Sequence, residues 1–167
     1  MRFRASRERG RSDSLAMPAE RQRFKTRKGH DEFQTFIDTW DAQEKSTKSP
    51  FLHLCSKLLV PDGVQLDFLP RPGVSYSLRA ERRLGEQWAL FALVDVVDDE
   101  PEKRWLSVCF YANTVSDPQK MGNLIPGGIR GKDGYCFDIF EEDQALVSYL
   151  AERIEEASDR IGTFDSK

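Results

Sequence analysis

The sequence predicts an α+β protein: an antiparallel five-stranded sheet with two N-terminal helices and one C-terminal helix packed on one face. Three observations lead to this prediction. Apolar residues recur with helical spacing before residue 60, alternate with polar residues from residue 64, and recur with helical spacing again after residue 143. Sequential strands joined by short turns form antiparallel sheets, and helices at the two ends of the chain then share one face.

The two N-terminal helices are predicted from their apolar stripes. The first covers residues 31–45, and the segment "STKS" breaks it. Ser49 and Pro50 suit the N-cap and first position of the second helix, which the turn sequence "PDG" at 61–63 ends. The stripes consist of Phe33, Phe36, Ile37 and Trp40 in the first helix and of Phe51, Leu54, Cys55, Leu58 and Leu59 in the second.

The five strands are predicted from the alternation that follows. Residues 64–68 and 74–80 form a hairpin around the turn "PRPG". The apolar stretch "EQWALFALVDVV" is the central strand, "WLSVCFYA" is the next, and "YCFDIF" is the fifth. Residues 113–134 are predicted to form a glycine-rich connection with one short helical turn near Ser116. The closing helix carries the stripe Leu146, Leu150, Ile154, Ala157 and Ile161.

Charge divides the chain into an arm and a body. Residues 1–30 carry ten basic and three acidic residues, whereas residues 31–167 carry fifteen basic and twenty-five acidic residues. The arm has too few apolar residues to offset its ordering entropy, so residues 1–30 are predicted to be disordered and residues 31–167 to form a single domain. The arm could contact nucleic acid or be a solvated tail, and translation could start at Met17 instead of Met1.

The cysteines and the hydropathy indicate a cytoplasmic protein. Cys55, Cys109 and Cys136 are widely spaced and form no CxxC pair, so they are interpreted as buried free thiols in a reducing compartment, and no zinc site is predicted. The sequence contains no apolar run long enough for a membrane span and no secretory h-region. No cofactor is predicted.

The glycine-rich segment "GNLIPGGIRGKDGYCFDIF" differs from a phosphate-binding loop. Such a loop places its N–H groups at a helix N-terminus, whereas these glycines precede a strand. Arg130 and Lys132 nevertheless supply positive charge, and long structured loops are often functional. Ligand binding through this loop is one hypothesis, and a connection rich in turns is the alternative.

A polar pocket is predicted on the sheet face away from the helices. The parity of the strands places Arg79, Cys109 and Tyr111 on that face, and Asp95 shares the parity of Phe91, Leu93 and Val97. An Asp within a strand this apolar costs free energy unless it is paired or near solvent. The alternative is a structural ion pair, or an Asp that faces water at a strand end. The predicted ligand-binding residues are Arg79, Asp95, Cys109, Tyr111, Asp138, Arg130 and Lys132.

No catalytic motif is legible in the sequence. There is no Gly-x-Ser-x-Gly, and "DVVDDEPE" lacks the pattern of a calcium loop. His53 and Cys55 lie two residues apart on a predicted helix, so they point to different faces and form no catalytic pair.

One family resemblance follows from the order of the elements. The stretch "LFALVDVVDDEPEKRWLSVCFYA", then "SDP", "IPGG", "GYCFDI" and a closing amphipathic helix, resembles the small α+β modules of the YjbR/MmcQ type over about residues 74–160. A frataxin-like arrangement is a similar alternative. The resemblance implies the fold class and transfers no catalytic residue.

The sequence therefore predicts a binding or interaction module whose contact surface is the open sheet face and the 113–134 segment. Its partner would be a protein or a small molecule, and a homodimer is possible. The alternatives are a small-ligand enzyme that uses Arg79, Asp95 and Asp138, and nucleic-acid association through the basic arm. Deletion of residues 1–30 should abolish nucleic-acid binding under the last hypothesis, and substitution of Asp95 and Asp138 should alter ligand binding under the enzyme hypothesis.

Overall fold

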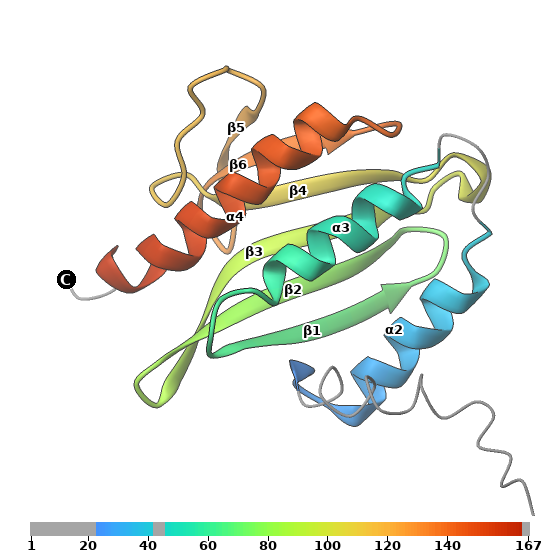
Figure 1. Cartoon of the computed structure of the whole chain (residues 1–167), viewed down its shortest axis with the longest axis horizontal. Coiled ribbons are helices and arrows are strands. Elements are labelled where there is room, and N and C mark those ends of the chain that lie inside the picture. Colours follow the sequence, from blue (N-terminus) through green and yellow to red (C-terminus); the bar gives the residue numbers. More distant parts are fainter. Residues whose placement is uncertain (1–22, 42–45, 165–167) are drawn as a thin grey trace, which may run out of the picture.

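The computed structural model describes residues 23–41 and 46–164 of the chain (Figure 1). Its helices are α2 (Arg27–Thr39), α3 (Lys48–Leu58) and α4 (Gln144–Phe164), and a short 3-10 helix, η1 (Pro101–Lys103), precedes the fourth strand. The strands are β1 (Val64–Arg71), β2 (Ser75–Leu84), β3 (Gln87–Val97), β4 (Trp105–Tyr111), β5 (Asn123–Ile129) and β6 (Lys132–Ile139).

All the strands belong to one antiparallel sheet in the order β1-β2-β3-β4-β6-β5. The predicted α+β class, the antiparallel pairing and the helices at the two ends of the chain are confirmed. Within the described residues the sheet has six strands instead of five, because residues 123–129 of the predicted connection form β5 and pair with β6. The sequence pattern hid β5 because Pro126 and two glycines interrupt it, and the pairing register shifts at this point.

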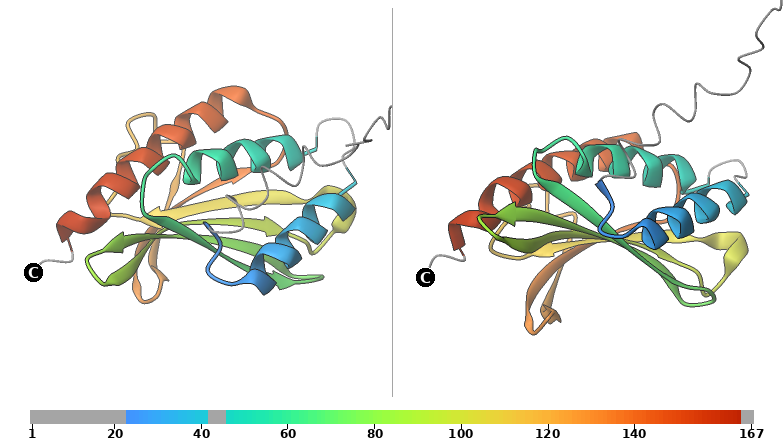
Figure 2. Two further views of the ribbon diagram at one scale, coloured as in Figure 1. Left: turned by 60° about the horizontal axis from the view of Figure 1, so that its bottom comes forward. Right: turned by 90° about the horizontal axis from the view of Figure 1, so that it is seen from below.

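The helices lie on one side of the sheet. Helices α3 and α4 cross its face, and α2 contacts β1 at its edge (Figures 1 and 2). The right view of Figure 2 shows that none of α2, α3 and α4 lies on the opposite side, and that the β5–β6 end bends away from α4. We call this opposite side the open face.

The core comes from alternate residues on the strands, as the alternation predicted. Phe68 and Leu78, for example, face the helices and are buried, whereas Asp67 and Arg79 face the other way. Val74 is an exception, because it lies in the β1–β2 turn and is 56% exposed. The fully buried side chains of the strands include Leu66, Leu78, Phe91, Leu106, Phe110, Phe137 and Ile139.

The first two helices begin earlier than the sequence indicated. Thr26 caps α2, and its hydroxyl accepts a hydrogen bond from the Gly29 N–H at 2.9 Å. Thr47, and not Ser49, precedes α3, and the Thr47 hydroxyl donates to the carbonyl of Arg104 at 2.7 Å. This tertiary hydrogen bond joins the start of α3 to the start of β4.

Residues 1–22, most of the predicted disordered arm, lie outside the described residues. Residues 23–30 are described and pack on the fold. Phe24 is 8% exposed and forms a parallel bridge with Leu66, and Arg23 donates hydrogen bonds to three backbone carbonyls between the end of α3 and β1. The ordered fold therefore begins before residue 31.

A buried ion pair ties the ends of several elements together. The Arg104 Nε donates to Asp98 Oδ1 at 2.7 Å, and Asp98 Oδ2 accepts from the Gly73 N–H at 2.8 Å. The Arg104 guanidinium also lies over the rings of Phe36, Trp40 and Tyr76, 5.2–5.5 Å from their centroids. Both charges are thereby compensated within the fold.

Candidate functional site

The structure divides the seven predicted site residues into two groups. Arg79, Asp95, Cys109 and Asp138 lie on the central strands of the open face. Tyr111, Arg130 and Lys132 meet at one end of the sheet, where they line a common cavity. The residues predicted to form one pocket therefore lie at two separate sites on the sheet.

A polar row crosses the middle of the open face. Ser77 pairs with Asp95, Asp95 with Ser107, and Ser107 with Asp138 in neighbouring strands. With strands about 4.8 Å apart, the two Asp Cα atoms are separated by about 10 Å, with Ser107 between them. The two carboxylates thus share a face without being direct neighbours.

Burial controls the ionisation of both aspartates. Desolvation raises the pKa of Asp95 against the opposing effects of the Ser77 hydrogen bond and the nearby Arg79 and Arg71 charges. Desolvation also raises the pKa of Asp138. In addition, Asp95 Oδ1 and Arg79 Nε are buried atoms without a hydrogen-bond partner. Burial of this polar row therefore disfavours the charged form of both aspartates, and not every buried polar atom in the row has a hydrogen-bond partner.

Arg79 is nearer to the β1 edge than to Asp138. It stands opposite Asp67 in β1 and Leu93 in β3. Together with Arg71 and Ser77 it lines a shallow cavity of about 520 Å³ that reaches α2. The structure thus brings Arg79 close to Asp95 but does not bring it to Asp138.

The free-thiol interpretation of Cys109 and Cys136 is wrong. These residues pair across β4 and β6 and form a disulfide, with their Cα atoms 4.2 Å apart. Cys55 is the free cysteine among the described residues, and it is buried in α3. Their wide separation in the sequence concealed the pair, because only the β4–β6 register places them side by side. Cys109 is therefore a covalent clamp between strands.

The parity of Asp95 with Phe91 is also wrong, because β3 contains a bulge. Ala80 pairs with Ala92 while Glu81 pairs with Leu90, so Phe91 is the extra residue. Phe91 turns into the core and is 1% exposed. A bulge bends its strand and increases the local twist.

The sheet forks just beyond this bulge. Among the described strands, β3 pairs with β4 only over Leu93–Val97, and the β3 residues before Leu93 pair with β2 alone. On the other branch, Phe110 and Tyr111 pair only with β6. The two branches diverge and leave a gap, which we call the fork pocket.

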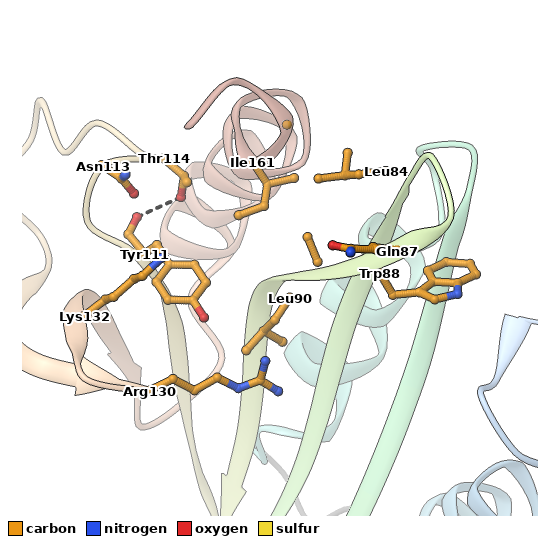
Figure 3. A pocket seen from close by; sticks show the side chains of 12 residues that line it. Leu84, Gln87, Trp88, Leu90, Tyr111, Asn113, Thr114, Arg130, Lys132 and Ile161 are labelled. Atoms are coloured by element: carbon orange, nitrogen blue, oxygen red, sulfur yellow. Dashed lines mark hydrogen bonds between the residues drawn. The ribbon is translucent and has the colours of Figure 1, made fainter. Parts of the chain in front are cut away.

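The fork pocket is a cavity of about 440 Å³ (Figure 3). This volume lies within the range of small-molecule sites in proteins. One wall comes from the β2–β3 hairpin, the other from the end of β4 and the β5–β6 turn, and the C-terminal part of α4 covers it. The lining residues are Leu84, Gln87, Trp88, Ala89, Leu90, Tyr111, Asn113, Thr114, Arg130, Lys132, Ile161 and Gly162.

The polar side chains enter the fork pocket from opposite walls. In Figure 3 the Arg130 guanidinium reaches into the gap from the β5–β6 turn, and the Gln87 amide reaches in from β3. Lys132 Nζ lies 5.7 Å from the centroid of the Tyr111 ring. Polar donors thus reach into a cavity that aliphatic side chains, among them Leu90 and Ile161, also line.

A hydrogen-bonded network holds the segment after β4 against α4. Tyr149 donates to Asp117 at 2.5 Å, and Ser116 donates to Glu156 at 2.6 Å. Burial would raise the pKa of Asp117, but the hydrogen bonds from Tyr149 and from two backbone N–H groups, with the Arg153 charge, lower it overall. The predicted helical turn near Ser116 is instead a turn closed by Asp117. These hydrogen bonds hold residues 116–117 against α4, directly after Asn113 and Thr114, which line the fork pocket.

Sequence reasoning found three residues of the fork pocket and missed the rest. Gln87, Trp88 and Ile161 belong to a hairpin and a helix that are distant in sequence from Tyr111. The local signal for this hairpin was weak, because a two-residue turn between strands favours Asn-Gly or Asp-Gly, whereas this chain has Arg130-Gly131. Nothing local indicated that two strands would separate.

Comparison with known proteins gives no relative: no family model, curated protein or solved structure matches this chain. The YjbR/MmcQ resemblance therefore stays a prediction. In residues 23–41 and 46–164, no group of three or more His, Cys, Asp or Glu side chains could hold a metal ion. No helix in the same residues is long and apolar enough to cross a membrane.

Proposed function

We propose that this protein is a non-enzymatic binding module and that a small molecule occupies its fork pocket. The observation that supports this proposal is the early end of the β3–β4 pairing, which leaves a cavity of ligand size between these two strands. Three residues predicted independently from the sequence, Tyr111, Arg130 and Lys132, line that cavity.

The chemistry of the lining favours binding over catalysis. General bases and nucleophiles are most often imidazole, carboxylate or thiol groups. The lining residues are instead aliphatic, aromatic, amide, hydroxyl and cationic. Such a surface can orient a ligand through hydrogen bonds and apolar contact.

Blocking the cavity tests the proposal. A fragment library of neutral, cationic and anionic compounds is titrated into the ¹⁵N-labelled protein, and backbone amide shifts are followed. We expect hits whose shifts cluster at Leu90, Tyr111 and the 130–132 turn.

Gln87→Trp should abolish these hits, because Gln87 is exposed at the mouth of the fork pocket and an indole there would fill the cavity. Val74→Trp, in an exposed turn outside the pocket lining, is the matched control. Hits that persist in Gln87→Trp, or a complete lack of hits, would overturn the proposal.

A second candidate is a small-ligand enzyme on the polar row, and one observation favours it. Asp95 combines a raised pKa with an unpartnered buried oxygen, a combination that is common at reactive sites. If Asp95→Asn and Asp138→Asn leave ligand-induced thermal shifts unchanged, this candidate fails.

Three further predictions from the sequence, which concern nucleic-acid binding, cellular location and oligomeric state, stay proposals. Nucleic-acid association through the basic arm, residues 1–30, requires salt-sensitive binding. Because residues such as Phe24 pack on the fold, the deletion that tests it removes residues 1–22 and should abolish that binding. The predicted cytoplasmic location rests on the cysteines and on the hydropathy of the sequence. The Cys109–Cys136 disulfide removes the first of these two grounds, because disulfides persist mainly in oxidising compartments. A homodimer would appear in sedimentation as twice the mass of 19.2 kDa.

A further inference from the structure

We infer that the ligand of the fork pocket is a small organic anion, whose carboxylate or phosphate head is held by Arg130, while Lys132 adds a second positive charge to the same lining. This inference rests on the proposed function and adds the chemical class of the ligand. Three independent features of the pocket support it: its uncompensated charge, the backbone conformation of Arg130 and the division of its lining into a polar and an apolar side.

Among residues 23–41 and 46–164, no acidic side chain lines the pocket to neutralise its positive charge. Within the described residues, neither Arg130 nor Lys132 forms an ion pair, and the Lys132 ammonium lies near the ring of Tyr111. None of the lining residues is acidic, although acidic residues outnumber basic ones in the whole chain, 28 to 25. Asp133, the neighbour of Lys132, accepts a hydrogen bond from the Gly127 N–H instead. The two cations are therefore available to an anion from solution.

Arg130 occupies a backbone conformation that suits other residues better. Its φ is 49° and that of Gly131 is 81°, between the paired residues Ile129 and Lys132. A two-residue hairpin turn with both φ values positive strongly prefers Asn-Gly, because a side chain such as Arg meets its own backbone there. An arginine at this position thus costs stability, and such costs concentrate at functional sites. The guanidinium offers a planar, bidentate donor to carboxylate or phosphate.

The lining also separates into two sides. Leu84, Leu90 and Ile161 supply an aliphatic surface for the body of a ligand. The Arg130 guanidinium and the Gln87 amide supply donors for its head (Figure 3). An organic acid or phosphate monoester of modest size matches this arrangement, whereas inorganic phosphate would leave the apolar side uncovered.

The ligand class is tested with four probes in NMR titrations of the full chain: benzoate, phenyl phosphate, the neutral benzamide and inorganic phosphate. We expect benzoate and phenyl phosphate to shift the amides of Leu90, Tyr111 and Arg130. Benzamide should bind at least about tenfold more weakly, because it lacks the charge that strengthens hydrogen bonds to Arg. Inorganic phosphate should bind more weakly than phenyl phosphate, because it lacks the apolar body.

The residue assignment is tested with a matched pair of variants. Lys120 also has a positive φ, of 53°, and lies outside the fork pocket. Arg130→Asn and Lys120→Asn therefore remove the same charge and relieve the same kind of backbone strain. Both should raise Tm, by up to about 3 °C. Only Arg130→Asn should weaken benzoate binding, by about tenfold.

The outcomes separate the two proposals. If benzamide binds in the pocket as tightly as benzoate, or if Arg130→Asn leaves benzoate affinity unchanged, the anion assignment is overturned while the binding module survives. If no fragment of any charge shifts the pocket amides, both proposals fail. If Lys120→Asn weakens benzoate binding as much as Arg130→Asn does, the effect is one of net charge and the assignment of Arg130 is overturned.

Discussion

Arg104 and Arg130 show two opposite uses of a guanidinium in one small protein. Arg104 is largely covered, pairs with the buried Asp98 at 2.7 Å and lies against three aromatic rings. Arg130 is exposed, occupies a strained turn and has no ion-pair partner in the part of the chain that the structure describes. A charge that the chain itself compensates holds the fold together, whereas a charge that it leaves uncompensated in a cavity can bind something else.

The largest effect is expected from breaking the compensated pair. Arg104→Met should lower the free energy of unfolding by about 3–5 kcal/mol, because it leaves the Asp98 carboxylate buried without its counter-charge. Urea denaturation followed by circular dichroism measures this loss. Arg130→Asn is the control and should cause no loss. A loss below about 1 kcal/mol for Arg104→Met would show that solvent already screens this pair.

A slightly smaller effect is expected from removing the disulfide that joins β4 to β6 beside the fork pocket. The Cys109–Cys136 disulfide closes a loop with a sequence separation of 27, so the double variant Cys109→Ser, Cys136→Ser should lose about 3.5 kcal/mol of stability. Reduction of the unmodified protein by a dithiol should cause the same loss. If mass spectrometry shows both thiols free and the free energy of unfolding is unchanged, the disulfide does not stabilise the protein.

The smallest effect is expected at Asp95, a charge that the chain compensates only in part. Burial raises its pKa, so its protonated form favours the folded state, and this contribution declines as pH rises from about 4 through the raised pKa. Asp95→Asn should therefore stabilise the protein at pH 7 by up to about 1 kcal/mol and have less effect at pH 4. Urea unfolding at both pH values measures the difference. Greater stabilisation at pH 4 than at pH 7 would contradict this sign.

Much of the fold could be predicted from local patterns. The stripe of Phe51, Leu54 and Leu58 is buried in α3, and the alternation through Leu66, Phe68 and Leu78 places these residues against the helices. Periodicity reports which side of an element meets the core, and this requires no knowledge of the neighbouring element. The strand β5 escaped detection because Pro126 and adjacent glycines remove the alternation.

The candidate site was only partly predictable. The sequence singled out Tyr111, Arg130 and Lys132, yet it grouped them with Arg79 and Asp95, which lie elsewhere on the open face. Strand parity assigns a face and says nothing about position along that face. The bulge at Phe91 then changed the parity itself, since one extra residue moves every side chain before it to the other side.

The sequence by itself determined the class of the fold, the order of its helices and most strands, and the sides of those strands that form the core. These depend on the spacing of apolar residues, which is a local property. Tertiary structure alone decided that Cys109 meets Cys136, that β3 separates from β4, and that a hairpin and a helix end close over the gap. These depend on register and on twist accumulated across several strands, and no single segment of the chain encodes either.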